Sequence, residues 1–241
     1  MNPGLVFVCA HLTDERLYAA QCAALAQDYD CSVHCFRTHD TMCGMARELL
    51  AKAPPRFTLI GLSLGGYVAE EVIRQDLGRL ERLVMMDTSA VADDAPHAAG
   101  RRADIEKVRR GGIDALIPEL PARWLHPDHA RRPDLCALMA SMARSVGATG
   151  QYNQQMAMLG RPDSHADLRR VRVPTLFVCG REDTARPIAE HEMMAACVPH
   201  SRFEIIDHCG HLSTIEQPDE VNALLTGWLR ANPPLADPRR S

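Results

Sequence analysis

A serine flanked by glycines is the residue whose setting most directly suggests chemistry. The sequence reads Gly-Leu-Ser-Leu-Gly over 61–65, after a strand-like run at 56–60 and before a helix-period run at 68–73. A sharp turn from strand to helix strains the backbone at such a serine and lifts its hydroxyl above the edge of a sheet. The N-terminal N–H groups of the following helix also favour an anion beside the serine. We therefore predict that Ser63 is a nucleophile.

Candidate partners for this hydroxyl lie near the C-terminus. A serine hydroxyl needs a base within hydrogen-bond reach, and His211 follows the last predicted strand, at the carboxyl edge of a sheet. The base in turn needs a carboxylate that holds its tautomer, and Asp183 follows the preceding predicted strand. The sequence thus predicts a Ser63–Asp183–His211 triad that attacks a carbonyl carbon.

Other residues compete for two of these roles. His208 stands in the same loop as the predicted base and is the alternative base. Glu182, adjacent to the predicted acid, and Asp87, at the end of an earlier predicted strand, are the alternative acids. Only the register of the loop separates His208 from the predicted base.

The elements that must position these residues alternate between strand and helix. Six apolar runs are predicted as strands, at 5–9, 32–36, 57–62, 82–86, 175–179 and 203–206. Helix-period segments lie between most of them. This alternation predicts an α/β fold with a mainly parallel, doubly wound sheet covered by helices.

The alternation stops between residues 91 and 167. No strand pattern occurs there, whereas helical patterns occur at 103–110 and 135–146. Because about 75 residues could hardly bury a core of their own, we expect a helical lid on a single domain. The predicted division is a core of residues 1–90 and 168–232, a cap at about 91–167, and a flexible tail at 233–241.

Composition excludes several classes of protein. The 241 residues include 27 Lys+Arg and 31 Asp+Glu, for a net charge of −4, and 46% are hydrophobic. This balance is that of a globular protein and not of a disordered chain or a basic nucleic-acid binder. The apolar run at 5–10 is too short for a membrane span or a secretory signal. We expect a cytoplasmic protein, monomeric or homodimeric, with neither nucleic acid nor membrane as a partner.

The cysteines and histidines show no metal-binding pattern. The nine cysteines are odd in number and form no Cys-x-x-Cys pair, so we expect reduced, mostly buried thiols. A zinc site at His126 and His129, or at Cys31 and Cys35, lacks a second pair at a suitable spacing. We therefore expect neither a metal nor an organic cofactor.

These motifs resemble those of the α/β-hydrolase fold superfamily, in its small capped carboxylesterase and enol-lactonase-like branch. The resemblance covers about residues 5–229 and is most specific at 61–66, 174–183 and 209–211. It implies that the chain cleaves a small carboxylic ester or lactone through an acyl-enzyme, with the serine, aspartate and histidine named above as nucleophile, acid and base.

The resemblance also implies an oxyanion hole formed by two backbone N–H groups. One belongs to Leu64, and the other to the loop after the first predicted strand, which reads His-Gly in much of the family. Here the matching positions are Cys9-Ala10, followed by His11 and Leu12. We place the second donor at His11, with Leu12 as the alternative.

Three residues are candidates for substrate contact: Leu12, Met156 and Arg161. Arg161 either clamps a substrate carboxylate through two parallel hydrogen bonds, as lid residues of related enol-lactonases and C–C bond hydrolases could, or forms a salt bridge between lid and core. Met156 either lines an adaptable apolar pocket under the lid or packs in the core.

Other reactions remain open on the same triad. They are those of a C–C bond hydrolase, a menaquinone-type synthase or lyase, and a cofactor-free haloperoxidase. A thioesterase that works with a carrier protein, and a ligand receptor that keeps the fold without turnover, are further alternatives. Epoxide hydrolases and haloalkane dehalogenases are disfavoured because they carry aspartate in place of Ser63.

Overall fold

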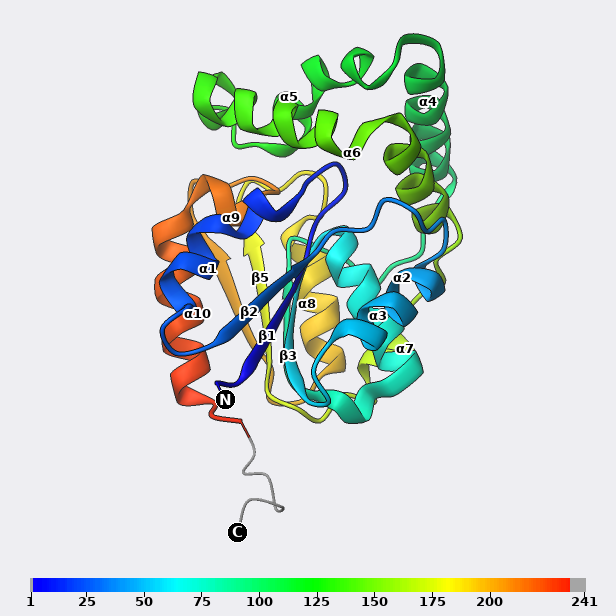
Figure 1. Ribbon diagram of the computed structural model, residues 1–241. Coiled ribbons are helices and arrows are strands. Elements are labelled where there is room, and N and C mark those ends of the chain that lie inside the picture. The colour runs from blue at the N-terminus through cyan, green and yellow to red at the C-terminus, as the bar shows by residue number, and fades with distance from the viewer. Residues whose placement is uncertain (1, 235–241) are drawn as a thin grey trace.

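Six parallel strands form the centre of the molecule in the computed structural model, which describes residues 2–234 (Figure 1). They are β1 (Gly4–Val8), β2 (Asp30–His34), β3 (Phe57–Leu62), β4 (Leu80–Met86), β5 (Thr175–Gly180) and β6 (Arg202–Ile206). Their order is β2-β1-β3-β4-β5-β6, and every neighbouring pair is parallel. The predicted fold class is confirmed. The tail predicted at 233–241 falls almost wholly outside the described residues.

Helices cover both faces of this sheet (Figure 1). They are α1 (Ala19–Leu25), α2 (Met42–Lys52), α3 (Leu64–Asp76), α7 (His165–Leu168), α8 (Ile188–Cys197), α9 (Ser213–Glu216) and α10 (Pro218–Ala231). Alternate residues of β1 serve the two faces: Leu5 and Phe7 pack in the core layer of α1 and α10, and Val6 and Val8 in that of α2, α3 and α8. Both faces are therefore apolar, which explains why the central strands appear in the sequence as unbroken apolar runs.

A helical insertion separates β4 from β5, and it lies over the end of the sheet toward which the strands point (Figure 1). Its main helices are α4 (Ala95–Gly111), α5 (Leu120–Trp124) and α6 (Pro133–Leu159). Gly147 has a φ of 71° and interrupts the helical dihedrals of α6, so the two halves of this helix meet at a kink. We call residues 95–159 the helical insertion. None of the helices described within residues 2–234 is long and apolar enough to cross a membrane.

The expectation that the cysteines are reduced needs one correction. Cys9 and Cys35 form a disulfide, whereas the other seven cysteines are free. These two residues directly follow β1 and β2, and Val8 lies opposite His34 in the parallel pairing of those strands. Sheet register thus places the two Cα atoms 5.1 Å apart, a proximity that the spacing along the chain does not reveal.

Candidate active site

The turn between β3 and α3 holds Ser63 in a strained conformation. Its φ of 54° and ψ of −110° lie outside the regions that a serine ordinarily adopts. A Cβ at Gly65 would collide with the carbonyl of Val8, and a Cβ at Gly66 would collide with the side chain of Thr88. The flanking glycines are therefore needed because strand, helix and neighbouring chain approach so closely.

Ser63, His211 and Asp183 form a chain of hydrogen bonds although they lie far apart in the sequence. The Ser63 Oγ is 2.9 Å from the Nε2 of His211, and the Nδ1 of His211 is 2.8 Å from the Oδ2 of Asp183. Because the ionised carboxylate only accepts, Nδ1 carries the ring proton and Nε2 is left to accept from the hydroxyl. All three residues are at least nine-tenths buried.

Several backbone groups hold His211 and Asp183 in place. The other carboxylate oxygen of Asp183 accepts hydrogen bonds from the N–H groups of Ala185, at 2.8 Å, and Arg186, at 2.9 Å. The N–H of His211 donates to the carbonyl of Trp124 in the helical insertion, at 2.6 Å. The loop that carries the imidazole is thus attached to the insertion above it.

Asp183 lies where it can keep the imidazole of His211 protonated at a higher pH than usual. Burial lowers the pKa of His211, but the charge of Asp183 and the hydrogen bond to it outweigh burial. The pKa of His211 is therefore raised above its ordinary value of 6.5.

The alternative base lies elsewhere in the structure. The imidazole of His208 is about half exposed and packs against the ring of His126, with 3.9 Å between the ring centroids. Its backbone has a φ of 53°, so the chain turns sharply between His208 and the residue that contacts Ser63.

The alternative acids also have other partners. Glu182 accepts a hydrogen bond from the N–H of Cys209, at 2.9 Å. Asp87 accepts from the hydroxyl of Ser213, at 2.5 Å, and from the N–H of Gly180, at 3.0 Å. Burial and the neighbouring charge of Asp183 raise the pKa of Asp87 to about 8, so this carboxyl is largely protonated at neutral pH.

The loop after β1 contains the two candidates for the second oxyanion donor, the backbone N–H groups of His11 and Leu12, and only one of them has a partner among the described residues. The N–H of Leu12 donates to the Oε1 of Gln154, at 3.0 Å. Among residues 2–234, neither the N–H of His11 nor that of Leu64 has an acceptor within hydrogen-bond distance. These two groups thus have no acceptor within this part of the chain, whereas that of Leu12 has one, which favours His11 over Leu12 as the second donor.

Gln154 of α6 was not predicted from the sequence and holds this loop from above. Its Oε1 accepts from both the Nδ1 of His11, at 2.8 Å, and the N–H of Leu12, while its Nε2 donates to the carbonyl of Phe36, at 2.7 Å. The amide is buried with every polar atom paired, so it sets the conformation of a strained loop in which Leu12 has a φ of 57°. The adjacent glutamines Gln154 and Gln155, both buried in α6, are the sequence signal that could have pointed to it.

The imidazole of His11 is neutral and does not compete as a base. Burial, with the charge of Arg101, lowers its pKa to about 3. Its Nδ1 donates to Gln154, and its Nε2 accepts from the side chain of Gln155, at 3.2 Å. The ring therefore keeps one tautomer and one orientation on the floor of the cavity described below.

The chain matches the model of a family described as "Alpha/beta hydrolase family" over residues 8–224. It belongs to that family. It is 24% identical over 243 residues to 3-oxoadipate enol-lactonase 1 of Acinetobacter baylyi, covering 95% of this chain and 89% of that protein.

Solved structures agree with this assignment. A thermophilic esterase from Thermogutta terrifontis superposes with a TM-score of 0.86 at 28% identity, over 96% of this chain and 90% of that one. An enol-lactonase from Burkholderia xenovorans superposes with the same TM-score at 22% identity, over 95% and 92% of the two chains. The second likeness shows the fold alone.

A cavity of about 390 Å³ opens beside the Ser63 hydroxyl of this hydrolase. His11, Ser63 and His211 contribute to it from the sheet side, and Trp124 and Met158 from the helical insertion. Arginines also line it, at positions 101, 123 and 186. The cavity therefore combines an apolar wall with guanidinium groups.

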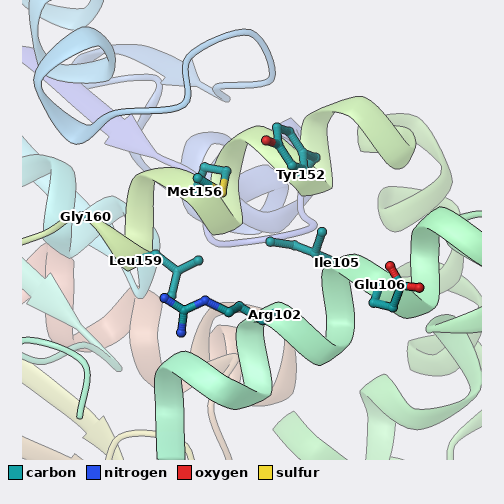
Figure 2. A pocket seen from close by; sticks show the side chains of 7 residues that line it. All are labelled: Arg102, Ile105, Glu106, Tyr152, Met156, Leu159 and Gly160. Atoms are coloured by element: carbon teal, nitrogen blue, oxygen red, sulfur yellow. The ribbon is translucent and has the colours of Figure 1, made fainter. Parts of the chain in front are cut away.

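The three residues predicted to contact substrate do not line this cavity. The guanidinium of Arg161 donates to Asp93, at 2.7 Å, and to the carbonyl of Val91, at 2.9 Å, so this arginine forms a buried salt bridge. Leu12 is buried in the core. Met156 lies in a separate groove between α4 and α6, where it is 37% exposed beside Ile105 and Tyr152 (Figure 2).

Within residues 2–234, two groups of side chains come close enough to share a metal ion, and each has a member that is already engaged. In the first, of His126, Asp128 and His208, the Nδ1 of His126 accepts the N–H of Asp128 at 3.1 Å. The second contains Asp87, Cys179 and Asp183, and Asp183 is the residue that holds His211. One ligand atom in each group therefore already has another role in the structure.

Proposed function

We propose that this protein is a serine hydrolase that cleaves a small carboxylic ester or lactone. The observation that carries the proposal is the hydrogen-bonded chain from the Ser63 Oγ through His211 to Asp183, at 2.9 and 2.8 Å, beside a cavity. Names among the relatives point the same way, since they include enol-lactonases, esterases and carbamate hydrolases. Their substrates share a carbonyl carbon that a hydroxyl can attack.

In the proposed reaction the Ser63 Oγ attacks the substrate carbonyl while the Nε2 of His211 takes the hydroxyl proton. The charge that develops on the carbonyl oxygen is stabilised by the N–H groups of Leu64 and His11. Asp183 stabilises the imidazolium, which then gives its proton to the leaving alcohol. Water, activated by the same imidazole, hydrolyses the acyl-enzyme. In a lactone the leaving alcohol stays attached to the acyl chain, so the ring opens.

The helical insertion acts in this proposal as the cap of the site. It contributes Trp124 and Met158 to the cavity, and its Gln154 holds the loop of the second oxyanion donor. The proposed division is a core of residues 1–90 and 168–232 with the cap between them. The cavity volume suits a small-molecule substrate.

A fluorophosphonate probe tests the proposal directly. An activated serine is expected to form a covalent adduct, found at Ser63 by mass spectrometry of digested protein. The same preparation is expected to hydrolyse short-chain p-nitrophenyl esters with a burst of p-nitrophenol as the acyl-enzyme accumulates. A folded protein that forms no adduct and hydrolyses neither esters nor lactones would show that the site is not a serine hydrolase.

The pH profile provides a second test. Only the neutral imidazole accepts the Ser63 proton, so kcat/KM is expected to fall as the pH drops through the pKa of His211. Because that pKa is raised, the midpoint of the acid limb is expected above pH 6.5. The measurement is kcat/KM for one neutral ester from about pH 5 to pH 9. A midpoint well below 6.5 would contradict the ion pair with Asp183.

A further inference from the structure

Arg186 is a buried guanidinium without a hydrogen bond. Its side chain is 8% exposed and lines the same cavity as Ser63 and His211. The nearest carboxylate oxygens are the Oε2 of Glu190, at 3.5 Å, and the Oδ1 of Asp93, at 3.9 Å. Within residues 2–234 no side chain or carbonyl accepts a hydrogen bond from this guanidinium. The guanidinium thus makes only these two long ion pairs in that part of the chain, and its N–H donors are left to form hydrogen bonds with a ligand in the cavity.

The neighbouring arginines differ because they form short hydrogen bonds with Asp93. Arg161 donates to the Oδ1 of Asp93 at 2.7 Å, and Arg101 donates to both oxygens at 2.5 and 3.2 Å. Their three hydrogen bonds occupy the carboxylate, so Arg186 stands at a longer distance from it. The third arginine of the cavity, Arg123, donates to both oxygens of Asp104 at 2.9 Å.

The position of Arg186 relative to the nucleophile is well defined. The backbone N–H of Arg186 donates to the Oδ1 of Asp183, and the other oxygen of that carboxylate holds His211. The side chain also lies beside the Tyr67 ring, with 5.7 Å between the guanidinium carbon and the ring centroid. An anion bound by Arg186 would therefore be held at a set distance from the Ser63 hydroxyl, which orients the carbonyl for attack.

We propose that Arg186 binds a free carboxylate of the substrate, so that the enzyme acts on an ester or lactone that also carries a carboxylate. This rests on the proposed function. The planar fork of a guanidinium matches the two oxygens of a carboxylate, and the pairing is strongest where water is excluded. The carboxylate clamp considered for Arg161 thus belongs to a different arginine, three residues after the triad acid.

Matched p-nitrophenyl esters test this assignment. The half-ester of glutaric acid carries the carboxylate, and the valerate ester of the same chain length lacks it. The ratio of their kcat/KM values is expected to favour the half-ester in the native enzyme and to fall roughly 10- to 100-fold in Arg186→Gln. Arg186→Lys keeps the charge but not the fork and is expected to restore part of the ratio. In Arg123→Gln, the control, the ratio is expected to stay within about twofold, because Asp104 already occupies that guanidinium.

Calorimetry with glutarate separates this inference from the function itself. Glutarate is expected to bind the native protein and to bind Arg186→Gln roughly 10-fold or more weakly, whether or not either protein turns over an ester. Equal binding to both proteins, or an unchanged ester ratio in an Arg186→Gln variant with native circular dichroism, would overturn the role of Arg186 and leave the serine hydrolase standing. If glutarate binds the native protein more tightly than Arg186→Gln, but the native protein neither hydrolyses esters nor forms the fluorophosphonate adduct, the proposed serine hydrolase function is overturned and the role of Arg186 stands.

Discussion

Replacing Ser63 with alanine is expected to lower kcat for ester hydrolysis by roughly 10⁴- to 10⁶-fold. The alanine has no atom to attack the carbonyl, so the acyl-enzyme does not form. What remains is the smaller contribution of the N–H groups of Leu64 and His11 and of substrate binding. The measurement is kcat for a p-nitrophenyl ester with purified protein, together with loss of the fluorophosphonate adduct.

The fold is expected to survive this change. The change removes only the hydrogen bond between the Ser63 hydroxyl and His211. The backbone N–H of Ser63 still donates to the carbonyl of Met86, and its carbonyl still accepts from the hydroxyl of Thr88. Ser89→Ala is a suitable control, since Ser89 is equally buried and lies outside the cavity. Its kcat is expected within about threefold of native. Ester hydrolysis by Ser63→Ala above about 1% of the native rate would mean that another group is the nucleophile.

Asp183→Asn is expected to lower kcat by roughly 10⁴-fold with little change in the backbone. The asparagine amide can donate to the Nδ1 of His211, which moves the ring proton to Nε2. That nitrogen then cannot accept from Ser63, so the base is lost although every side chain stays near its place. Kinetics at saturating ester, with a check of KM, measure the loss.

Asp87→Asn is the matched control and also tests the alternative acid. Asp87 is as buried as Asp183, and its pKa of about 8 means that its carboxyl is largely uncharged at neutral pH. Replacing it by a neutral amide is therefore expected to lower kcat less than about 10-fold. A larger loss of kcat in Asp87→Asn than in Asp183→Asn would mean that Asp87, which follows β4, is the acid of the triad.

The position of the strands was predictable because a parallel sheet buried on both faces requires continuous apolar runs. The prediction at 57–62 coincides with β3 (Phe57–Leu62). The largest displacement is at the sheet edge, where 32–36 was predicted and β2 spans Asp30–His34. This edge strand is only partly buried and begins with a charged residue, so its apolar pattern marks its position less sharply.

The sequence alone also determined the turn at Ser63, because its causes are local. A strand, two glycines and a helix within a dozen residues suffice to specify it. The candidate acid and base followed from the same logic, since each lies just beyond the carboxyl end of a recognisable strand. The family assignment then agreed with the motifs on which the resemblance was based.

Only the tertiary structure decided which polar groups meet. Gln154 contacts Leu12 across 142 residues, and Cys9 pairs with Cys35 through sheet register. Asp93 hydrogen-bonds to Arg161, whereas Arg186 keeps only long ion pairs among the residues that the structure describes. Apolar periodicity specifies which face of a helix or strand is buried, but not which side chain of another element lies opposite. Hydrogen bonds need their two atoms within about 3 Å, so these pairings depend on how distant segments cross, which no local pattern encodes.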